Sequence, residues 1–117
     1  IRAVVPYTWE VTTFAGAYNE SDVTDGTGAN ARFVWPKGIT TDGTYLYVVD
    51  GPWADVIRRI EISTADVTTI AGDSSADPGS TWGVGSSALF ANPADITTDG
   101  INLYIAEEGN HLIRKMQ

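Results

Sequence analysis

The chain of 117 residues contains no cysteine and a single histidine, His111. Without cysteine there is no disulfide framework and no thiolate metal site, and the cysteine count does not decide between an oxidising and a reducing compartment. A catalytic zinc ion needs three protein ligands, so one imidazole cannot hold it unless three copies of His111 meet on a symmetry axis. We therefore expect no metal and no cofactor, and we expect His111 to hold a turn.

Basic residues are also scarce, with seven Lys and Arg against fifteen Asp and Glu and a formal net charge of -8. The negative electrostatic field of such a chain repels phosphate backbones and anionic lipid surfaces. Apolar runs are only a few residues long, so none could span a bilayer. We expect neither nucleic-acid binding nor membrane insertion.

What the chain does contain is an internal repeat. Residues 26–50 return as residues 83–107, and both copies include Ile-Thr-Thr-Asp-Gly, at 39–43 and 96–100. A second repeat relates Ile1-Arg2 to Ile57-Arg58 and to Ile113-Arg114. Repetition every 56 or 57 residues indicates stacked units of supersecondary structure.

No segment shows a 3.6-residue apolar period, whereas short β-branched and aromatic runs recur between turn residues, so the sequence predicts an all-β fold. Asp42-Gly43 is a hairpin signal. The run after it is apolar at every position, which is typical of a strand covered on both faces. We expect strands a, b, c and d at 38–41, 45–49, 56–62 and from 67 onward; strands a, b and c again at 93–98, 103–106 and 112–116; and strands c and d at 1–5 and 11–15.

Units of four short antiparallel strands are typical of β-propeller blades. Asn110-His111-Leu112, between strands b and c, is the tripeptide after which NHL repeats are named, and the Val-Thr-Thr-Phe/Ile-Ala-Gly strands fit the same pattern. The chain thus resembles NHL-repeat β-propellers of the bacterial extracellular or periplasmic type. The other blade departs from the pattern, because Gly51-Pro-Trp-Ala-Asp55 replaces the Asn-His turn, and we expect that turn to be shaped differently.

The resemblance implies an extracellular or periplasmic location and a ring of six blades, so that three copies of this two-blade chain would form a homotrimer. Residues 33–72 would form a complete blade, while residues 1–16 and 93–117 would supply strands c and d and strands a, b and c of a shared blade. Strand c is then present twice; we favour the C-terminal copy, with residues 1–5 displaced or added at an edge. The alternative is that the two blades belong to a longer propeller.

Loops between blades and b-to-c turns open on one face of a propeller, and three of the four tryptophans fall there. Aromatic groups beside carboxylates and amides suit sugars, peptides or cationic groups, although these tryptophans could instead cap blade junctions. The candidate binding residues are Arg32, Trp35, Asp50, Trp53, Asp55, Trp82, Glu107, Asn110 and His111.

The preferred function is a non-enzymatic scaffold that self-assembles and presents loops to a protein or a glycan. One alternative is a hydrolase or lyase with symmetry-related carboxylates at the ring axis. Substitution of Asp50 and Glu107 together would test it, because an enzyme would lose turnover with its assembly intact. Another is a structural fragment of a longer propeller. The acidic loop 22–25 lacks an alternating calcium-ligand pattern and is interpreted as solvated.

Overall fold

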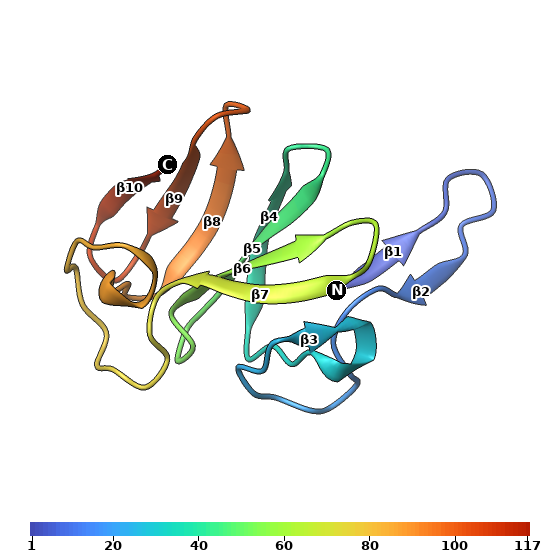
Figure 1. Ribbon diagram of the computed structural model, residues 1–117, viewed down its shortest axis with the longest axis horizontal. Helices are drawn as coiled ribbons and strands as arrows, with labels where there is room; N and C mark the ends of the chain where they lie inside the picture. The colour runs from blue at the N-terminus through green and yellow to red at the C-terminus, as the bar shows by residue number, and fades with distance from the viewer.

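The computed structural model describes residues 1–117 and is all-β, with antiparallel sheets and two short 3-10 helices (Figure 1). Nearly every expected strand is present to within two residues. The strands are β1 (Arg2–Val4), β2 (Val11–Thr13), β3 (Gly26–Thr27), β4 (Pro36–Thr41), β5 (Tyr45–Asp50), β6 (Val56–Glu61), β7 (Asp66–Ala71), β8 (Pro93–Thr98), β9 (Leu103–Glu107) and β10 (Leu112–Met116), and the helices are η1 (Gly28–Asn30) and η2 (Gly85–Ser87).

The central sheet has the order β3-β7-β6-β5-β4. Strands β4 to β7 are the predicted complete blade, and each pairs antiparallel with its neighbour in the chain. Strand β3 was not predicted: it adds a fifth strand by pairing Gly26 with Val67 and Thr27 with Asp66. The segment interpreted as a polar loop thus closes the outer edge of this blade.

The second blade is a three-stranded sheet of β8, β9 and β10, with β10 at its edge. It packs beside the central sheet, and β4 and β8 are neighbours across the junction. The β1–β2 hairpin extends from the other end of the molecule, far from β10 (Figure 1). The two segments expected to share a blade therefore lie at opposite ends of one chain.

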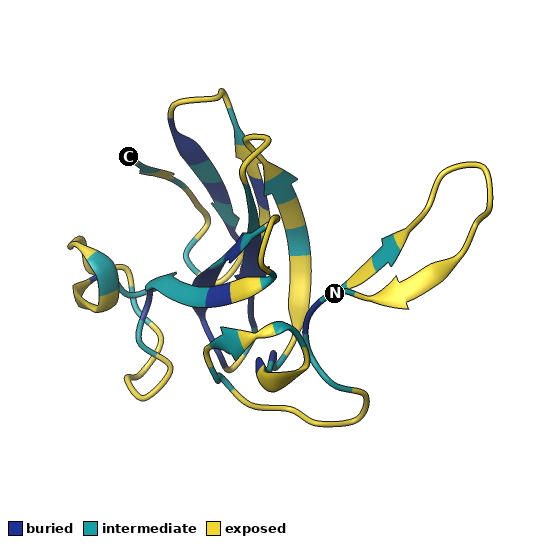
Figure 2. Cartoon of the chain, turned by 45° about the vertical axis from the view of Figure 1, so that its right-hand side comes forward, coloured by how far each residue is buried: buried dark blue, intermediate teal, exposed yellow.

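Apolar side chains cover both faces of the central sheet, as the uninterrupted apolar run of β5 predicts. Figure 2 shows the buried residues concentrated in the middle strands. One cluster lies between the two blades and contains Val49, Ile57, Ala71, Ala88, Phe90, Ile96, Leu103 and Ile105. The other lies on the opposite face and contains Ala15, Ala31, Phe33, Val48, Ile60 and Val67.

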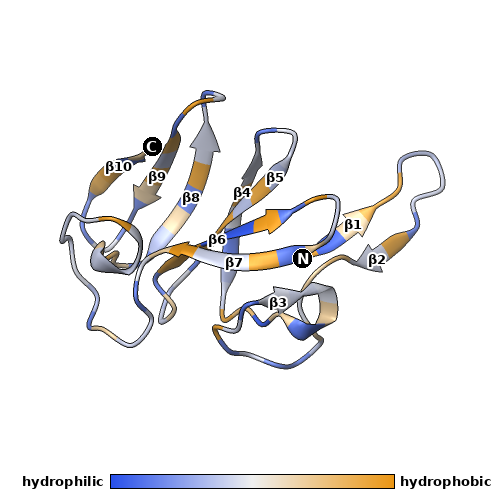
Figure 3. Ribbon diagram, in the orientation of Figure 1, coloured by the Kyte–Doolittle hydropathy of each residue, from blue (hydrophilic) through white to orange (hydrophobic).

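Residues 1–5 were expected to be displaced or added at an edge, and in the structure they form β1, which pairs with β2. The register is Arg2 with Thr13, Ala3 with Thr12 and Val4 with Val11. It matches the pairing of β6 with β7 at the same repeat positions. The hairpin is mostly exposed, whereas apolar residues elsewhere follow the packed strands (Figure 3).

None of the helices has the length and apolar character that crossing a bilayer requires.

Candidate binding site

Two exposed tryptophans form an aromatic pair at one end of the central blade. Trp35 directly precedes β4, and Trp53 lies in the turn between β5 and β6. Their ring centroids are 5.7 Å apart with the planes at 76°, an edge-to-face arrangement that aromatic pairs favour. The rings are 52% and 74% exposed. The pair is therefore open to a ligand.

The turn that carries Trp53 is held in an unusual backbone conformation. Trp53 and Asp55 both have left-handed φ angles, of 72° and 51°. The corresponding turn of the second blade has this conformation at His111, with φ of 58°. The prediction that the two turns differ in shape is confirmed.

Asp50 fixes the other tryptophan from beneath. Its carboxylate accepts hydrogen bonds from the backbone N–H groups of Trp35 at 2.7 Å and Val34 at 3.1 Å. The Arg58 guanidinium lies 3.3 Å away, and both charged side chains are fully buried. Burial raises the pKa of Asp50, and the two N–H groups and Arg58 oppose that shift. Asp50 therefore positions Trp35 and is not itself accessible to a ligand.

The second blade repeats this buried arrangement. Glu107 accepts the N–H of Ala91 at 2.7 Å and lies 3.2 Å from Arg114. Each arginine also donates to a backbone oxygen and stacks on a phenylalanine, at 4.8 Å for Arg58 over Phe33 and 5.4 Å for Arg114 over Phe90. Both carboxylates thus belong to the packing of their blades.

A polar network links the Trp53 turn to the second blade. Asp55 accepts the N–H of Asn92 at 2.7 Å. The Asn92 side chain donates to Glu108 at 3.0 Å, and Lys37 lies 3.7 Å from the same carboxylate. Burial raises the pKa of Asp55, the Glu107 charge adds to the rise, and the Asn92 N–H opposes it. An amide, an ammonium and an exposed carboxylate group therefore flank the blade end that bears the tryptophans.

The remaining candidate residues lie apart from this pair. Trp82 is 85% exposed in the connection between β7 and β8. Arg32 forms an ion pair with Glu20 at 2.5 Å. Asn110 donates to Glu107 and to the backbone oxygen of Gly79, so its amide stabilises the turn.

Sequence reasoning missed Lys37 and Asn92, which match no chemical motif and become neighbours only when the blades pack. It also missed the role of the arginines. A usable signal existed, because Arg58 and Arg114 occupy the same position in the repeat.

The structure contains no cluster of three or more His, Cys, Asp or Glu side chains that could hold a metal ion.

Solved structures of proteins from Bacteroides share this fold. A Bacteroides thetaiotaomicron protein of unknown function matches 97% of the chain with a TM-score of 0.88 and 32% identity. A protein named as an auxiliary nutrient binding protein, from the same species, matches 99% with a TM-score of 0.79 and 24% identity. A third, with a provisional phosphatase name, matches 97% with a TM-score of 0.78 and 21% identity.

The chain spans 28%, 31% and 28% of the length of these three neighbours. They are propeller-like proteins, and the paired sheets described here are consistent with a fragment of such a propeller. No protein-family model matches the sequence, and no curated protein matches it. The similarity to NHL repeats therefore rests on the residues quoted above.

Proposed function

We propose that this chain is a non-enzymatic β-propeller module that self-assembles and binds a glycan or a protein through the Trp35–Trp53 pair. The observation that carries the proposal is the pair itself: the two tryptophans stay 52% and 74% exposed, and Asp50 holds the backbone of Trp35. Exposed aromatic surface on a rigid support is typical of binding sites, because little conformational entropy is lost when the ligand binds.

A glycan is the preferred ligand class. Sugar rings have apolar C–H faces that pack on aromatic rings and hydroxyl edges that need hydrogen-bond partners. Lys37, Asn92 and Glu108 supply donors and acceptors at the same end of the blade. The auxiliary nutrient binding protein among the structural neighbours supports a binding role.

Location outside the cytoplasm is part of the proposal and rests on the resemblance to NHL propellers. Self-assembly rests on the blade arithmetic, because three copies of a two-blade chain would give the six blades that the resemblance implies.

The alternative function is a hydrolase or lyase with carboxylates at a ring axis. One structural neighbour has a phosphatase name, which is the observation in favour of an enzyme. Asp50 and Glu107 do not favour it, because both carboxylates are buried and already engaged by N–H groups and an arginine. A hydrolytic site needs a carboxylate that reaches its substrate.

Intrinsic tryptophan fluorescence tests the binding proposal. The chain would be titrated with neutral oligosaccharides such as xylohexaose, cellohexaose and maltohexaose. We expect one series to shift the emission of the parent chain. The double variant Trp35→Ala/Trp53→Ala removes the two reporting rings, so its binding is compared with that of the parent by isothermal titration calorimetry. We expect this variant to bind about tenfold or more weakly, since each lost aromatic contact is worth about 1 kcal/mol.

Trp9→Ala is the matched control, because Trp9 is 74% exposed in the β1–β2 loop, away from the pair. This variant should bind as the parent does. If no oligosaccharide changes the fluorescence, the glycan proposal fails; if Trp9→Ala weakens binding as much as the double variant, the site is misassigned.

A further inference from the structure

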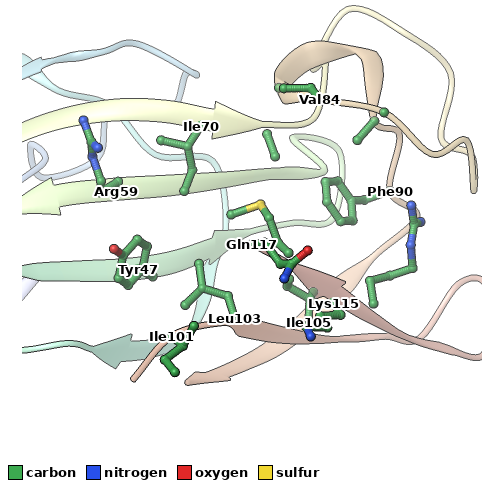
Figure 4. Close-up of a pocket in the computed structure, with 16 residues that line it drawn as sticks. Tyr47, Arg59, Ile70, Val84, Phe90, Ile101, Leu103, Ile105, Lys115 and Gln117 are labelled. Atoms are coloured by element: carbon green, nitrogen blue, oxygen red, sulfur yellow. The ribbon is translucent and has the colours of Figure 1, made fainter. Parts of the chain in front are cut away.

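The outer edge of β10 is unpaired and borders a cavity of about 500 Å3 whose lining is mostly apolar but includes Arg59, Arg114 and Lys115. Leu103, Ile105 and Phe90 of the second blade line it together with Ile70 and Tyr47 of the first (Figure 4). On the edge strand, Ile113 is 73% exposed. The second blade therefore leaves both backbone hydrogen-bonding groups and apolar surface without a partner, which favours the addition of a strand.

The central blade shows which residue fills the equivalent space beside its own third strand, β6. There β7 pairs with β6, and Val67, only 1% exposed, packs with Ala31, Phe33, Val48 and Ile60. The repeat relates those four residues to the cavity-lining residues Ala88, Phe90, Ile105 and Met116. The cavity is thus the counterpart of the place that Val67 fills.

The chain contains one other segment with the sequence of β7. Residues 11–16 repeat residues 67–72, so Val11 corresponds to Val67. All three residues of β2 are exposed, and Val11 is 48% exposed. Within one chain β2 cannot reach β10, because the hairpin and β10 lie at opposite ends of a molecule 43 Å long (Figure 1).

We propose that the β10 edge and its cavity bind strand β2 of a second copy of this chain, antiparallel, with Val11 in the cavity. The inference rests on the self-assembly proposed above and names its contact. The β6–β7 register transfers directly: Met116 pairs with Val11, Lys115 with Thr12, and Arg114 with Thr13.

The new pairing requires β1 to leave β2. Strands β1 and β10 are both copies of strand c, and they would use the same edge of β2 at the same residues. Three residue pairs are lost and the equivalent three are formed, while Val11 moves from solvent into a cavity lined mostly by apolar residues. Burial of Val11 therefore favours the exchange.

A disulfide between copies tests the register. The chain has no cysteine, so Thr12→Cys with Lys115→Cys introduces the only two thiols. Directly paired residues of antiparallel strands lie within disulfide range. We expect oxidation of the double variant to give covalent multimers on a non-reducing gel, and we expect each single variant to give none beyond dimers.

A second cysteine pair tests the competing arrangement. If the intact β1–β2 hairpin displaced β10, Ala3 would pair with Tyr104 of the other copy, as Arg59 pairs with Tyr47. Multimers from Ala3→Cys/Tyr104→Cys, and none from the first pair, would overturn the proposal.

Matched charge substitutions give an independent readout by light scattering. Val11→Asp should convert the assembly to monomer, whereas Val4→Asp should leave it intact, because β1 is released. Both side chains are about half exposed, at 48% and 53%, so neither substitution removes core packing from the single chain. Equal loss of assembly in both variants, or no loss in either, would contradict the assignment.

Oligosaccharide binding measured on the Val11→Asp chain separates the two proposals. Unchanged binding with lost assembly supports both. A multimer that binds no oligosaccharide would remove the glycan proposal and leave the strand contact standing.

Discussion

The Arg58 side chain shows how a single residue organises a blade. Its guanidinium donates to the backbone oxygens of Arg32 and Thr24 and contacts the carboxylates of Asp50 and Asp25. It thereby ties the connection before β4 to the middle of the sheet. A buried charge is tolerated here because its partners compensate for the lost hydration.

Asp50→Ala should destabilise the chain by about 3–5 kcal/mol, because it leaves the Arg58 charge buried without its only fully buried carboxylate partner. Urea unfolding followed by tryptophan fluorescence measures this loss. Glu61→Ala, at a half-exposed position outside the network, should cost less than about 1 kcal/mol. A loss for Asp50→Ala as small as that control would contradict the structural role.

At the scale of the element, the β4–β5 and β8–β9 hairpins use one turn design twice. Asp42 accepts the N–H groups of Thr44 and Tyr45 and the Tyr47 hydroxyl. Asp99 has the equivalent partners in Ile101, Asn102 and Tyr104. The following glycines, Gly43 and Gly100, have φ angles of 93° and 90°, which favour glycine.

These hydrogen bonds should make the hairpins sensitive to acid. The backbone N–H of Tyr45 is the largest cause that lowers the pKa of Asp42, and the N–H of Asn102 does the same for Asp99. A lowered folded-state pKa contributes stability above the unfolded value of about 3.9, and that stability is lost as the pH falls through the folded pKa.

The double variant Asp42→Asn/Asp99→Asn should therefore lose less stability than the parent between pH 5 and the acid limit of folding. An amide keeps the Oδ1 acceptor, so the turns can still form. Urea unfolding at a series of pH values measures the difference, with Asp77→Asn in an exposed loop as the control. Parallel curves for parent and double variant would contradict the role of the turn carboxylates.

The Asp50 and Asp55 carboxyls act in the opposite direction, because burial raises their pKa values. Protonation of these groups favours the folded state. Asp50 and Asp55 are present in both the parent and the Asp42→Asn/Asp99→Asn variant. Their effect on the free energy of unfolding therefore cancels when the two proteins are compared.

At the scale of the whole molecule, one complete blade, one three-stranded blade and an outlying hairpin extend over 43 × 31 × 21 Å. One end has the open edge of β10, and the other end has β2, whose sequence repeats that of the strand beside β6 in the complete blade. Complementary patches at opposite ends form heterologous contacts, which close into a ring when the rotation between copies permits.

Light scattering coupled to size exclusion should give a mass three times that of the chain, consistent with six blades. The mass should hold over a wide concentration range, because a closed ring has no free edges. A species of two chains would indicate four blades or swapped pairs, and a monomer at all concentrations would contradict self-assembly.

Local pattern was enough to predict the strands. The β-branched runs, the Asp-Gly hairpins and the repeat located β4 to β10 because each strand carries its own signal in consecutive residues. Strand β3 and helix η1 escaped prediction because Gly26 to Asn30 have no period and are ordered by contacts with β7 and with the segment before them. Helix η2 at Gly85–Ser87 is a single short turn that likewise has no period.

The candidate site was predicted only in part. The sequence singled out Trp35 and Trp53, but not their edge-to-face contact, and it grouped them with buried Asp50 and Glu107. Exposure depends on which way a strand end faces, and alternate residues of a strand face opposite sides. A carboxylate beside a tryptophan in the chain can therefore be buried beneath it.

The sequence by itself determined the all-β class, the two repeated units and the positions of their strands, because these depend on residue type and spacing along the chain. Only the tertiary structure decided that Arg58 and Arg114 hold the buried carboxylates, that the two tryptophans meet, and that β1 pairs with β2 at the far end from β10. Those features depend on how the strands pair and on which way their side chains face, which residue type and spacing alone do not encode.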